Sequence, residues 1–352
     1  MQPQFKIKNS QFTIQNYALK EDFSDICAYH VGGLLAVIDW ITVFPYLRYL
    51  KRKTTDSLRM DYLGDRKQIE QDIRHGAFFM TNHRDIVMDA AWLSWLLRKR
   101  YFIRPYMGVG NNLFAKKWIE FAMRFERCFV VKRGAGAHAQ VANAIHLSAY
   151  IRHLREQGKS IWLAQREGRA KDSNDRTQAS VLHMLTMGTA DFYEAVKTLN
   201  ICPVSINYEF DPCDFLKARE MQLRRDNPHW HKSKRDDVES MQTGIQGYKG
   251  NVVYRLTPSI NPEIDAMLAQ HPEYRTLPHS EQIQHVCDII DRHIHLGYEI
   301  YNRGTKFDAY IESRLALIDI PNKDEAFLRD KLMEMYNNPV INHQSAIKNL
   351  QS

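Results

Sequence analysis

Between residues 76 and 257 the chain alternates short apolar runs with longer segments that carry apolar residues at helical spacing. The short runs predict strands at 76–81, 103–109, 128–132, 160–164, 202–209 and 252–257. The longer segments predict helices at about 86–99, 113–126, 137–157, 178–199 and 212–225. This alternation is typical of an α/β fold, so we expect a central mixed, mostly parallel sheet covered by helices.

The segment 1–55 differs from this centre. An apolar stretch at 31–47 with clustered aromatics is followed by a basic run at 51–53. This combination predicts an amphipathic helix or hairpin that docks on an anionic membrane, and an ordinary helix packed on the main domain fits equally well. The short length and the charge of Asp39 make a membrane span unfavourable.

The remaining domain boundaries follow from changes of pattern. Residues 54–75 are polar and predict no element, and we assign 56–262 to the α/β domain. Within it, 224–250 is hydrophilic and basic, and we expect an exposed insertion, of which a solvated loop is the simplest form. Beyond Pro262 the pattern predicts a helical extension at 263–352, with 281–302 as its clearest helix.

Composition narrows the class of protein. The chain has 352 residues and a formal charge of +7, which favours acidic partners such as phosphates, anionic lipid surfaces or nucleic acid. Its five cysteines are scattered without a C-x-x-C pair, so neither a disulfide framework nor a zinc ribbon is indicated, and a reducing compartment is expected. The polar start of the chain lacks the apolar core of a signal peptide.

The first candidate for chemistry is a polar turn between the strand at 76–81 and the helix at 86–99. His83 stands in this turn, Asp85 occupies the expected helix N-cap, and Asp89 follows. Either carboxylate could hold one ring nitrogen and leave the other free as a base. A histidine in a turn is more often only a turn residue, and an aspartate after it only a cap.

Other predicted strand ends also carry polar residues. The strand 128–132 leads into Lys132, Arg133 and Gly134, which suit an anionic group or a solvated terminus. The strand 160–164 leads into the run Gln165–Asp172, in which Arg166, Glu167, Gly168 and Arg169 are adjacent. Glycine allows close backbone approach and arginine offers a planar fork for phosphate, while a charged turn with internal ion pairs is the alternative.

Four blocks together resemble the glycerolipid acyltransferase family, which includes the lysophosphatidate and glycerol-3-phosphate acyltransferases. They are Asn82-His83-Arg84-Asp85-Ile86-Val87-Met88-Asp89, Phe129-Val130-Val131-Lys132-Arg133, Glu167-Gly168-Arg169 and Cys202-Pro203-Val204-Ser205-Ile206. The family has one residue fewer between histidine and aspartate, and its third-block arginine lies one position further along. A divergent bacterial subgroup has sequence runs similar to those of this chain at both positions, so the departures indicate a subgroup of the family.

The resemblance implies transfer of an acyl group from acyl-ACP or acyl-CoA to a hydroxyl of a lysophospholipid or glycerol phosphate, in phospholipid biosynthesis. His83 would act as general base and Asp89, or failing that Asp85, as its partner. The acceptor would be held by substrate-binding residues: Asn82, Arg84, Arg133, Arg166, Glu167, Gly168 and Arg169. No cofactor or metal is implied, because the thiolate is already a good leaving group. Oxyanion donors would be backbone amides after Asp85.

These expectations leave other possibilities open. An amino-acid lysolipid is an alternative acceptor, and a non-catalytic lipid-binding or acyl-carrier-binding protein is an alternative class. A nucleic-acid-binding protein is disfavoured because the basic residues form no recognised module. Since a lysolipid is presented at a bilayer, we expect a peripheral protein on the cytoplasmic face of the cell membrane.

Overall fold

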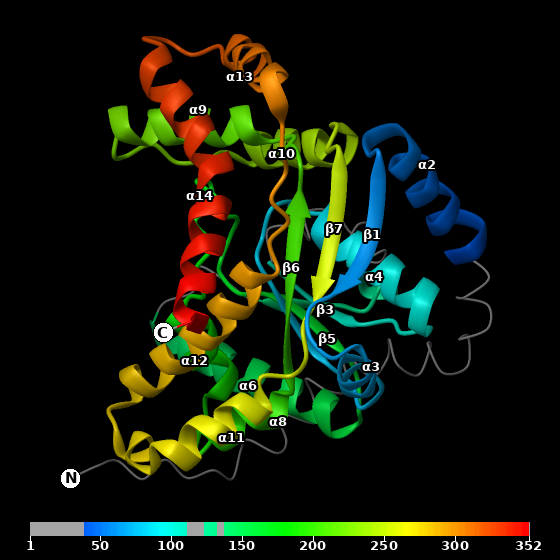
Figure 1. The fold of residues 1–352 in the computed structure, drawn as a ribbon, viewed down its shortest axis with the longest axis vertical. Helices are drawn as coiled ribbons and strands as arrows, with labels where there is room; N and C mark the ends of the chain where they lie inside the picture. Colours follow the sequence, from blue (N-terminus) through cyan, green and yellow to red (C-terminus); the bar gives the residue numbers. More distant parts are fainter. Residues whose placement is uncertain (1–38, 111–122, 132–136, 352) are drawn as a thin grey trace.

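The computed structural model describes residues 39–110, 123–131 and 137–351, which contain one seven-stranded sheet (Figure 1). Its order is β1 (Ser57–Tyr62), β7 (Asn251–Leu256), β6 (Ile201–Tyr208), β2 (Phe78–Thr81), β5 (Ile161–Ala164), β3 (Tyr106–Gly110) and β4 (Cys128–Val131). The strands from β6 to β4 run parallel, whereas β7 is antiparallel to β6 and parallel to β1. The predicted mixed, mostly parallel α/β fold is therefore confirmed.

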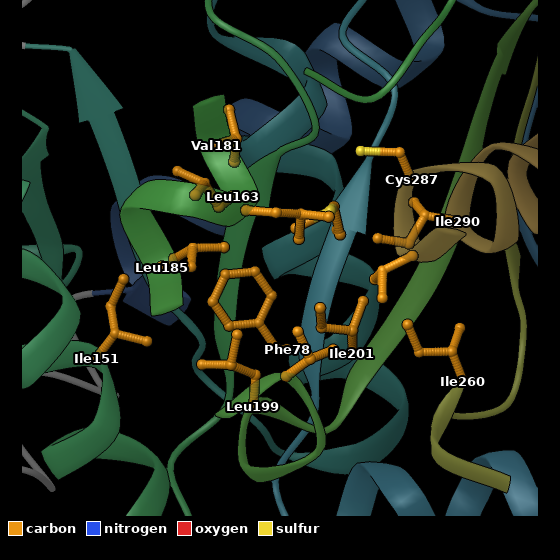
Figure 2. Packing of buried hydrophobic residues seen from close by; sticks show 14 of the residues in the cluster. Phe78, Ile151, Leu163, Val181, Leu185, Leu199, Ile201, Ile260, Cys287 and Ile290 are labelled. Atoms are coloured by element: carbon orange, nitrogen blue, oxygen red, sulfur yellow. The ribbon is translucent and has the colours of Figure 1, made fainter. Parts of the chain in front are cut away.

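Alternate residues of the strands bury opposite faces of the sheet. One core holds Phe78 and Ile201 and is covered by α6 (Ala137–Glu156), α7 (Ala179–Thr186), α8 (Phe192–Leu199), α11 (Asn261–Gln270) and α12 (His279–Leu296). Figure 2 shows Phe78 among side chains that these helices contribute. The other core holds Phe79 and is covered by α2 (Phe44–Thr54), α3 (Arg66–Arg74) and α4 (Met88–Tyr101).

The strand register brings two of the polar turns to the same edge of the sheet. Thr81, the last residue of β2, pairs with Ala164, the last residue of β5. Because the two strands are parallel neighbours, the segments after Thr81 and after Ala164 leave the sheet side by side. This edge, formed by carboxyl ends of strands, is where ligands gather in open α/β sheets.

The predicted C-terminal extension is helical. After η4 (Pro272–Thr276), α12 and η5 (Gly304–Lys306), it continues with α13 (Phe307–Ala316) and α14 (Glu325–Gln351). A third cluster of buried apolar residues joins α13 and α14 to α9 (Asp214–Asp226). Figure 1 shows α14 running between α9 and α12, so the extension packs along the α/β domain.

The structure corrects several predicted boundaries. The polar segment 54–75, for which no element was predicted, contains β1 and α3. The helix predicted at 178–199 is two helices, because Gly188, with a φ of +82°, ends the first and Asp191 caps the second. The helix predicted at 281–302 ends at Leu296. Most of the helix predicted at 113–126 lies outside the described residues.

The prediction of a solvated loop within 224–250 is wrong for much of that segment. Residues Lys234–Gln246 form α10, whose N-terminus has a capping box between Ser233 and Asp236. Ser240 and Gly244 on this helix are buried, although many of its other side chains are exposed. The basic insertion is thus a packed helix, and Gly244 places it against the turn after β2.

The predicted membrane-docking segment is described only in part, since residues 1–38 lie outside the described residues. The short helix η2 (Asp39–Val43) leads into α2, which buries Leu47 and Leu50 against the domain and exposes Tyr46 and Tyr49. Among the helices that the structure describes, none is long and apolar enough to cross a membrane.

Candidate active site

The turn after β2 brings His83 and Asp89 into contact. Asp89 lies in the first turn of α4, and its Oδ2 is 2.9 Å from His83 Nδ1. The His83 side chain is 13% exposed, whereas the Asp89 side chain is fully buried. Of the two carboxylates that sequence reasoning left open, Asp89 is the one that contacts the imidazole.

Four donors converge on the Asp89 carboxylate. Its Oδ2 accepts the backbone N–H groups of Arg84 at 2.7 Å and of Asp85 at 2.9 Å, in addition to the His83 ring. Its Oδ1 accepts the Tyr208 hydroxyl of β6 at 2.9 Å. An acceptor surrounded in this way favours the tautomer with the proton on Nδ1, so the lone pair of His83 is on Nε2.

Asp85 has a different role from Asp89. Its Oδ1 accepts the N–H groups of Val87 at 2.8 Å and of Met88 at 2.7 Å, which fixes the backbone at the start of α4, although the N-cap residue is Val87 and not Asp85 as predicted. Its Oδ2 is buried without a hydrogen-bond partner among the residues that the structure describes, and burial together with the nearby charge of Asp89 raises the pKa of Asp85. A Cβ on Gly244 of α10 would lie 1.9 Å from this oxygen, so only glycine fits there.

The structure does not bring Asn82 and Arg84, which were predicted to bind substrate, to the cavity. Asn82 is buried and pairs with the backbone of Ile206, accepting its N–H at 2.7 Å and donating to its carbonyl at 3.0 Å. The Arg84 guanidinium is buried 2.8 Å from Asp175 Oδ2, with the Tyr298 ring beside it. Both side chains hold the turn in place instead.

The turn after β5 presents its charges differently. Gly168 has a φ of +72°, in the left-handed region that favours glycine, which reverses the chain between Glu167 and Arg169. Neither Arg166 nor Arg169 forms an ion pair with a carboxylate of the described residues, and Arg166 Nε and Arg169 Nη1 are buried without a hydrogen-bond partner. Arg133, the cation predicted at the end of β4, lies outside the described residues.

The loop that carries this turn is anchored by residues that sequence reasoning missed. The buried Asp175 accepts Arg84 and the Tyr298 hydroxyl, the latter at 2.7 Å. Asp291 of α12 accepts both the N–H and the hydroxyl of Thr177, at 2.7 and 2.6 Å, and burial raises its pKa to about 6. These partners lie far apart in sequence, so only the folded chain reveals them.

A cavity of about 970 Å³ opens at this edge of the sheet and includes His83 in its wall. Its apolar wall comes from β3, β4, β5, α6, α7 and the residue after α7: Val109, Val130, Val131, Val141, Ala144, Leu147, Leu163, Val181, Met184 and Met187. Its charged wall comes from the loop after β5 and from α9, α10 and their connection: Arg166, Glu167, Arg169, Lys171, Glu220, Arg224, Lys232 and Asp237. The cavity therefore has an apolar region and a charged region, as an amphiphilic ligand requires.

The arrangement is suited to general base catalysis. None of the described residues hydrogen-bonds to His83 Nε2, and the ring meets Trp162 edge-on at 6.4 Å between centroids. A hydroxyl brought to Nε2 would lose its proton to a ring that Asp89 orients and stabilises once charged. No three His, Cys, Asp or Glu side chains of the described residues are grouped as metal ligands.

Fold and site thus define an α/β protein with a histidine–aspartate pair at the carboxyl edge of its sheet. A family model described as Acyltransferase matches residues 63–207, which contain all four sequence blocks. This match supports a general acyltransferase role and is consistent with the glycerolipid acyltransferase family. No curated protein matches the chain.

Proposed function

We propose that this protein transfers a fatty acyl group from acyl-ACP or acyl-CoA to a hydroxyl of a lysophospholipid or of glycerol phosphate. The observation that carries the proposal is that His83, held by Asp89, lines a cavity that has an apolar region and two arginines without ion-pair partners among the described residues. The acyltransferase match supports the reaction type. The donor and the acceptor are those that the resemblance to the glycerolipid acyltransferase family implies, and the apolar and charged regions of the cavity suit them.

In the proposed reaction His83 Nε2 takes the proton of the acceptor hydroxyl while the hydroxyl oxygen attacks the thioester carbonyl. Asp89, held by its four donors, stabilises the imidazolium that forms. The tetrahedral intermediate then collapses, the C–S bond breaks, and the thiolate leaves with the proton from the imidazolium. The substrate oxygen takes the place of a protein nucleophile, so His83 needs no neighbouring serine or cysteine.

The two regions of the cavity suit the two ends of a lysolipid. The apolar wall between β3, β4, α6 and α7 offers aliphatic side chains to an acyl chain, and burying each methylene contributes about 0.8 kcal/mol. Arg166 and Arg169 offer guanidinium groups to a phosphate, which arginine binds through paired hydrogen bonds. We propose Arg133, which the resemblance assigns to the acceptor, as a third cation.

A panel of acceptors tests the proposal. Purified protein is incubated with labelled acyl-ACP or acyl-CoA and with glycerol 3-phosphate or lysolipids, and the labelled product is measured. We expect transfer to at least one acceptor, and we expect His83→Ala to lower kcat by about two orders of magnitude or more. If the wild type binds lysolipid but transfers nothing to any acceptor, the chain is a lipid-binding protein and the proposal is wrong.

We further propose that the protein works as a peripheral protein on the cytoplasmic face of the cell membrane. The exposed Tyr46 and Tyr49 of α2, the exposed Ile41 before them and the basic residues at 51–53 support docking on anionic lipid. Replacing both tyrosines by serine should reduce flotation with anionic vesicles, while Leu47 and Leu50 keep α2 packed. Equal flotation of this variant and the wild type would contradict the assignment.

A further inference from the structure

A charged rim on α9 and α10 lies beyond the residues that the family model matches. Glu220 and Arg224 of α9, Lys232 between the helices and Asp237 of α10 form this rim, and all four line the cavity that contains His83. Their presence in the wall means that the part of the chain after β6 also shapes the acceptor site.

Glu220 is the centre of the rim. It is 5% exposed, and its Oε1 lies 2.5 Å from Lys171 Nζ and 2.9 Å from Arg224 Nη2. Lys232 is paired in turn with Asp237 at 2.7 Å. The rim cations are therefore bound to carboxylates, in contrast to Arg166 and Arg169, which have no such partner among the described residues.

The rim lies directly beside Arg169. A second pocket of about 10 Å³ is lined by Arg169, Glu220 and Lys232, and all three also line the main cavity. A phosphate on Arg169 would thus place the next group of the headgroup at Glu220.

A site for an anion alone does not explain this rim. Glu220 and Asp237, together with Glu167, put three carboxylates in the wall that would receive the phosphate. A buried carboxylate close to a bound phosphate is repulsive, and repulsion is stronger where water is excluded. A headgroup that carries an ammonium beside its anion removes this conflict, because the ammonium bonds to Glu220 while the anion bonds to the cations that Glu220 now holds.

We propose that Glu220 and the rim around it form a subsite for the ammonium of a zwitterionic acceptor headgroup. The acceptor class is then a lysolipid with an anion and an amine a few bonds apart, as in a phosphoethanolamine ester or an amino-acid lipid. Binding exchanges partners within the Lys171–Glu220–Arg224 group: Glu220 pairs with the ammonium, and Lys171 and Arg224 pair with the anion, so no charge is left unpaired. The inference rests on the proposed acyltransferase function and specifies its acceptor.

The test compares three acceptors of equal chain length: a lysophosphatidate, a lysophosphatidylethanolamine and an amino-acid lysolipid. We expect the wild type to favour the amine-bearing acceptors by kcat/KM. Comparing lysophosphatidylethanolamine with the amino-acid lysolipid then shows whether the anion of the preferred headgroup is a phosphate or a carboxylate. Glu220→Gln should lower the ratio of kcat/KM for the preferred amine acceptor to that for lysophosphatidate by about tenfold or more, the size of a lost charge-assisted hydrogen bond. Glu220→Asp, which keeps the charge, should restore part of the ratio.

Glu239→Gln is the matched control, because Glu239 of α10 pairs with Arg219 at 2.7 Å and does not line the cavity. It should leave the acceptor ratio unchanged. If Glu220→Gln lowers kcat/KM by the same factor for all acceptors, Glu220 only positions Lys171 and Arg224, and the inference is wrong. A wild-type preference for lysophosphatidate also overturns it. Absence of transfer to every acceptor would instead refute the proposed function.

Discussion

The turns after β2 and after β5 leave the sheet side by side, but they differ in how their polar side chains are paired. In the first, Asp89 has four donors and Arg84 is paired with Asp175 inside the protein. In the second, Arg166 and Arg169 have no ion pair with the described residues and line the cavity. In the first turn the polar groups are paired with other groups of the protein, whereas in the second turn the two arginines are available to bind a ligand.

This difference separates two kinds of function. A group that takes a proton must be held in one position, and the closed network around Asp89 fixes the His83 ring before any substrate arrives. Groups that bind an anion need unused donors, and the second turn provides them. Changes in the first turn should therefore lower kcat or stability, and changes in the second should raise KM.

The largest effect is expected from Asp89→Asn. An asparagine keeps its amide oxygen toward the two backbone N–H groups and the ring and turns its NH₂ toward the Tyr208 hydroxyl, but it lacks the negative charge that stabilises the imidazolium. We expect kcat to fall by about two orders of magnitude or more with KM little changed. Steady-state kinetics of the folded variant measure this effect.

Asp85→Asn is the matched comparison for Asp89→Asn. An asparagine Oδ1 still accepts the N–H groups of Val87 and Met88, so the start of α4 keeps these hydrogen bonds. We expect most of the activity to remain. An equal loss of kcat in the two variants would show that the first turn does not act through Asp89 alone.

Gly244→Ala tests how tightly α10 closes the first turn. The new Cβ would lie 1.9 Å from Asp85 Oδ2, so the helix or the turn must shift. We expect the free energy of unfolding to fall by about 1–3 kcal/mol, measured by denaturant unfolding, with Gln242→Ala on the exposed face of α10 as control. A fully stable variant would mean that α10 is not packed against Asp85.

Arg166→Gln tests the second turn. It removes a cation that has no ion-pair partner in the described part of the chain, so we expect KM for an anionic acceptor to rise about tenfold while kcat changes little. Arg176→Gln, an exposed arginine of the same loop that does not line the cavity, is the control. A fall in kcat without a change in KM would place Arg166 in the chemistry and end the distinction between the two turns.

A further prediction concerns the anchor of the second turn. Because burial raises the pKa of Asp291 from 3.8 to about 6, the folded state binds more protons than the unfolded state between these values. The free energy of unfolding should therefore fall as pH rises from about 4 to about 6. Asp291→Asn still accepts the two Thr177 donors, and its unfolding curves should show less of this pH dependence. An unchanged slope would exclude Asp291 as its source.

The strands of the sheet were predictable where burial leaves a clear apolar run, as in Phe78–Thr81 and Ile161–Ala164. The pattern failed in β1, because Ser57–Tyr62 is an edge strand whose side chains are mostly half-buried. It also missed α3, whose apolar contribution is limited to Ile69 and Ile73. Basic composition suggested a solvated loop at α10, where the buried residues are the small Ser240 and Gly244.

The part of the site whose residues are close together in sequence could be predicted. The spacing of His83, Asp85 and Asp89 places both carboxylates near the ring, but only the path of the turn decides between them. Arg84 has the same charge as Arg166, and it pairs with an aspartate 91 positions away, Asp175, which no local pattern reveals. No pattern in the sequence indicated a role for Tyr208, although its hydroxyl donates to Asp89 Oδ1.

The loop after β5 is also tied to α14, since Asn338 donates to the Asp172 carbonyl at 2.8 Å and Asn342 donates to Asn174 at 3.3 Å. These contacts span 166 and 168 positions of sequence, and contacts of such separation form late when a chain refolds. Helices, whose hydrogen bonds are local in sequence, should therefore reappear before the charged wall of the cavity takes shape. On dilution from denaturant, recovery of ligand binding should lag behind recovery of the far-ultraviolet signal.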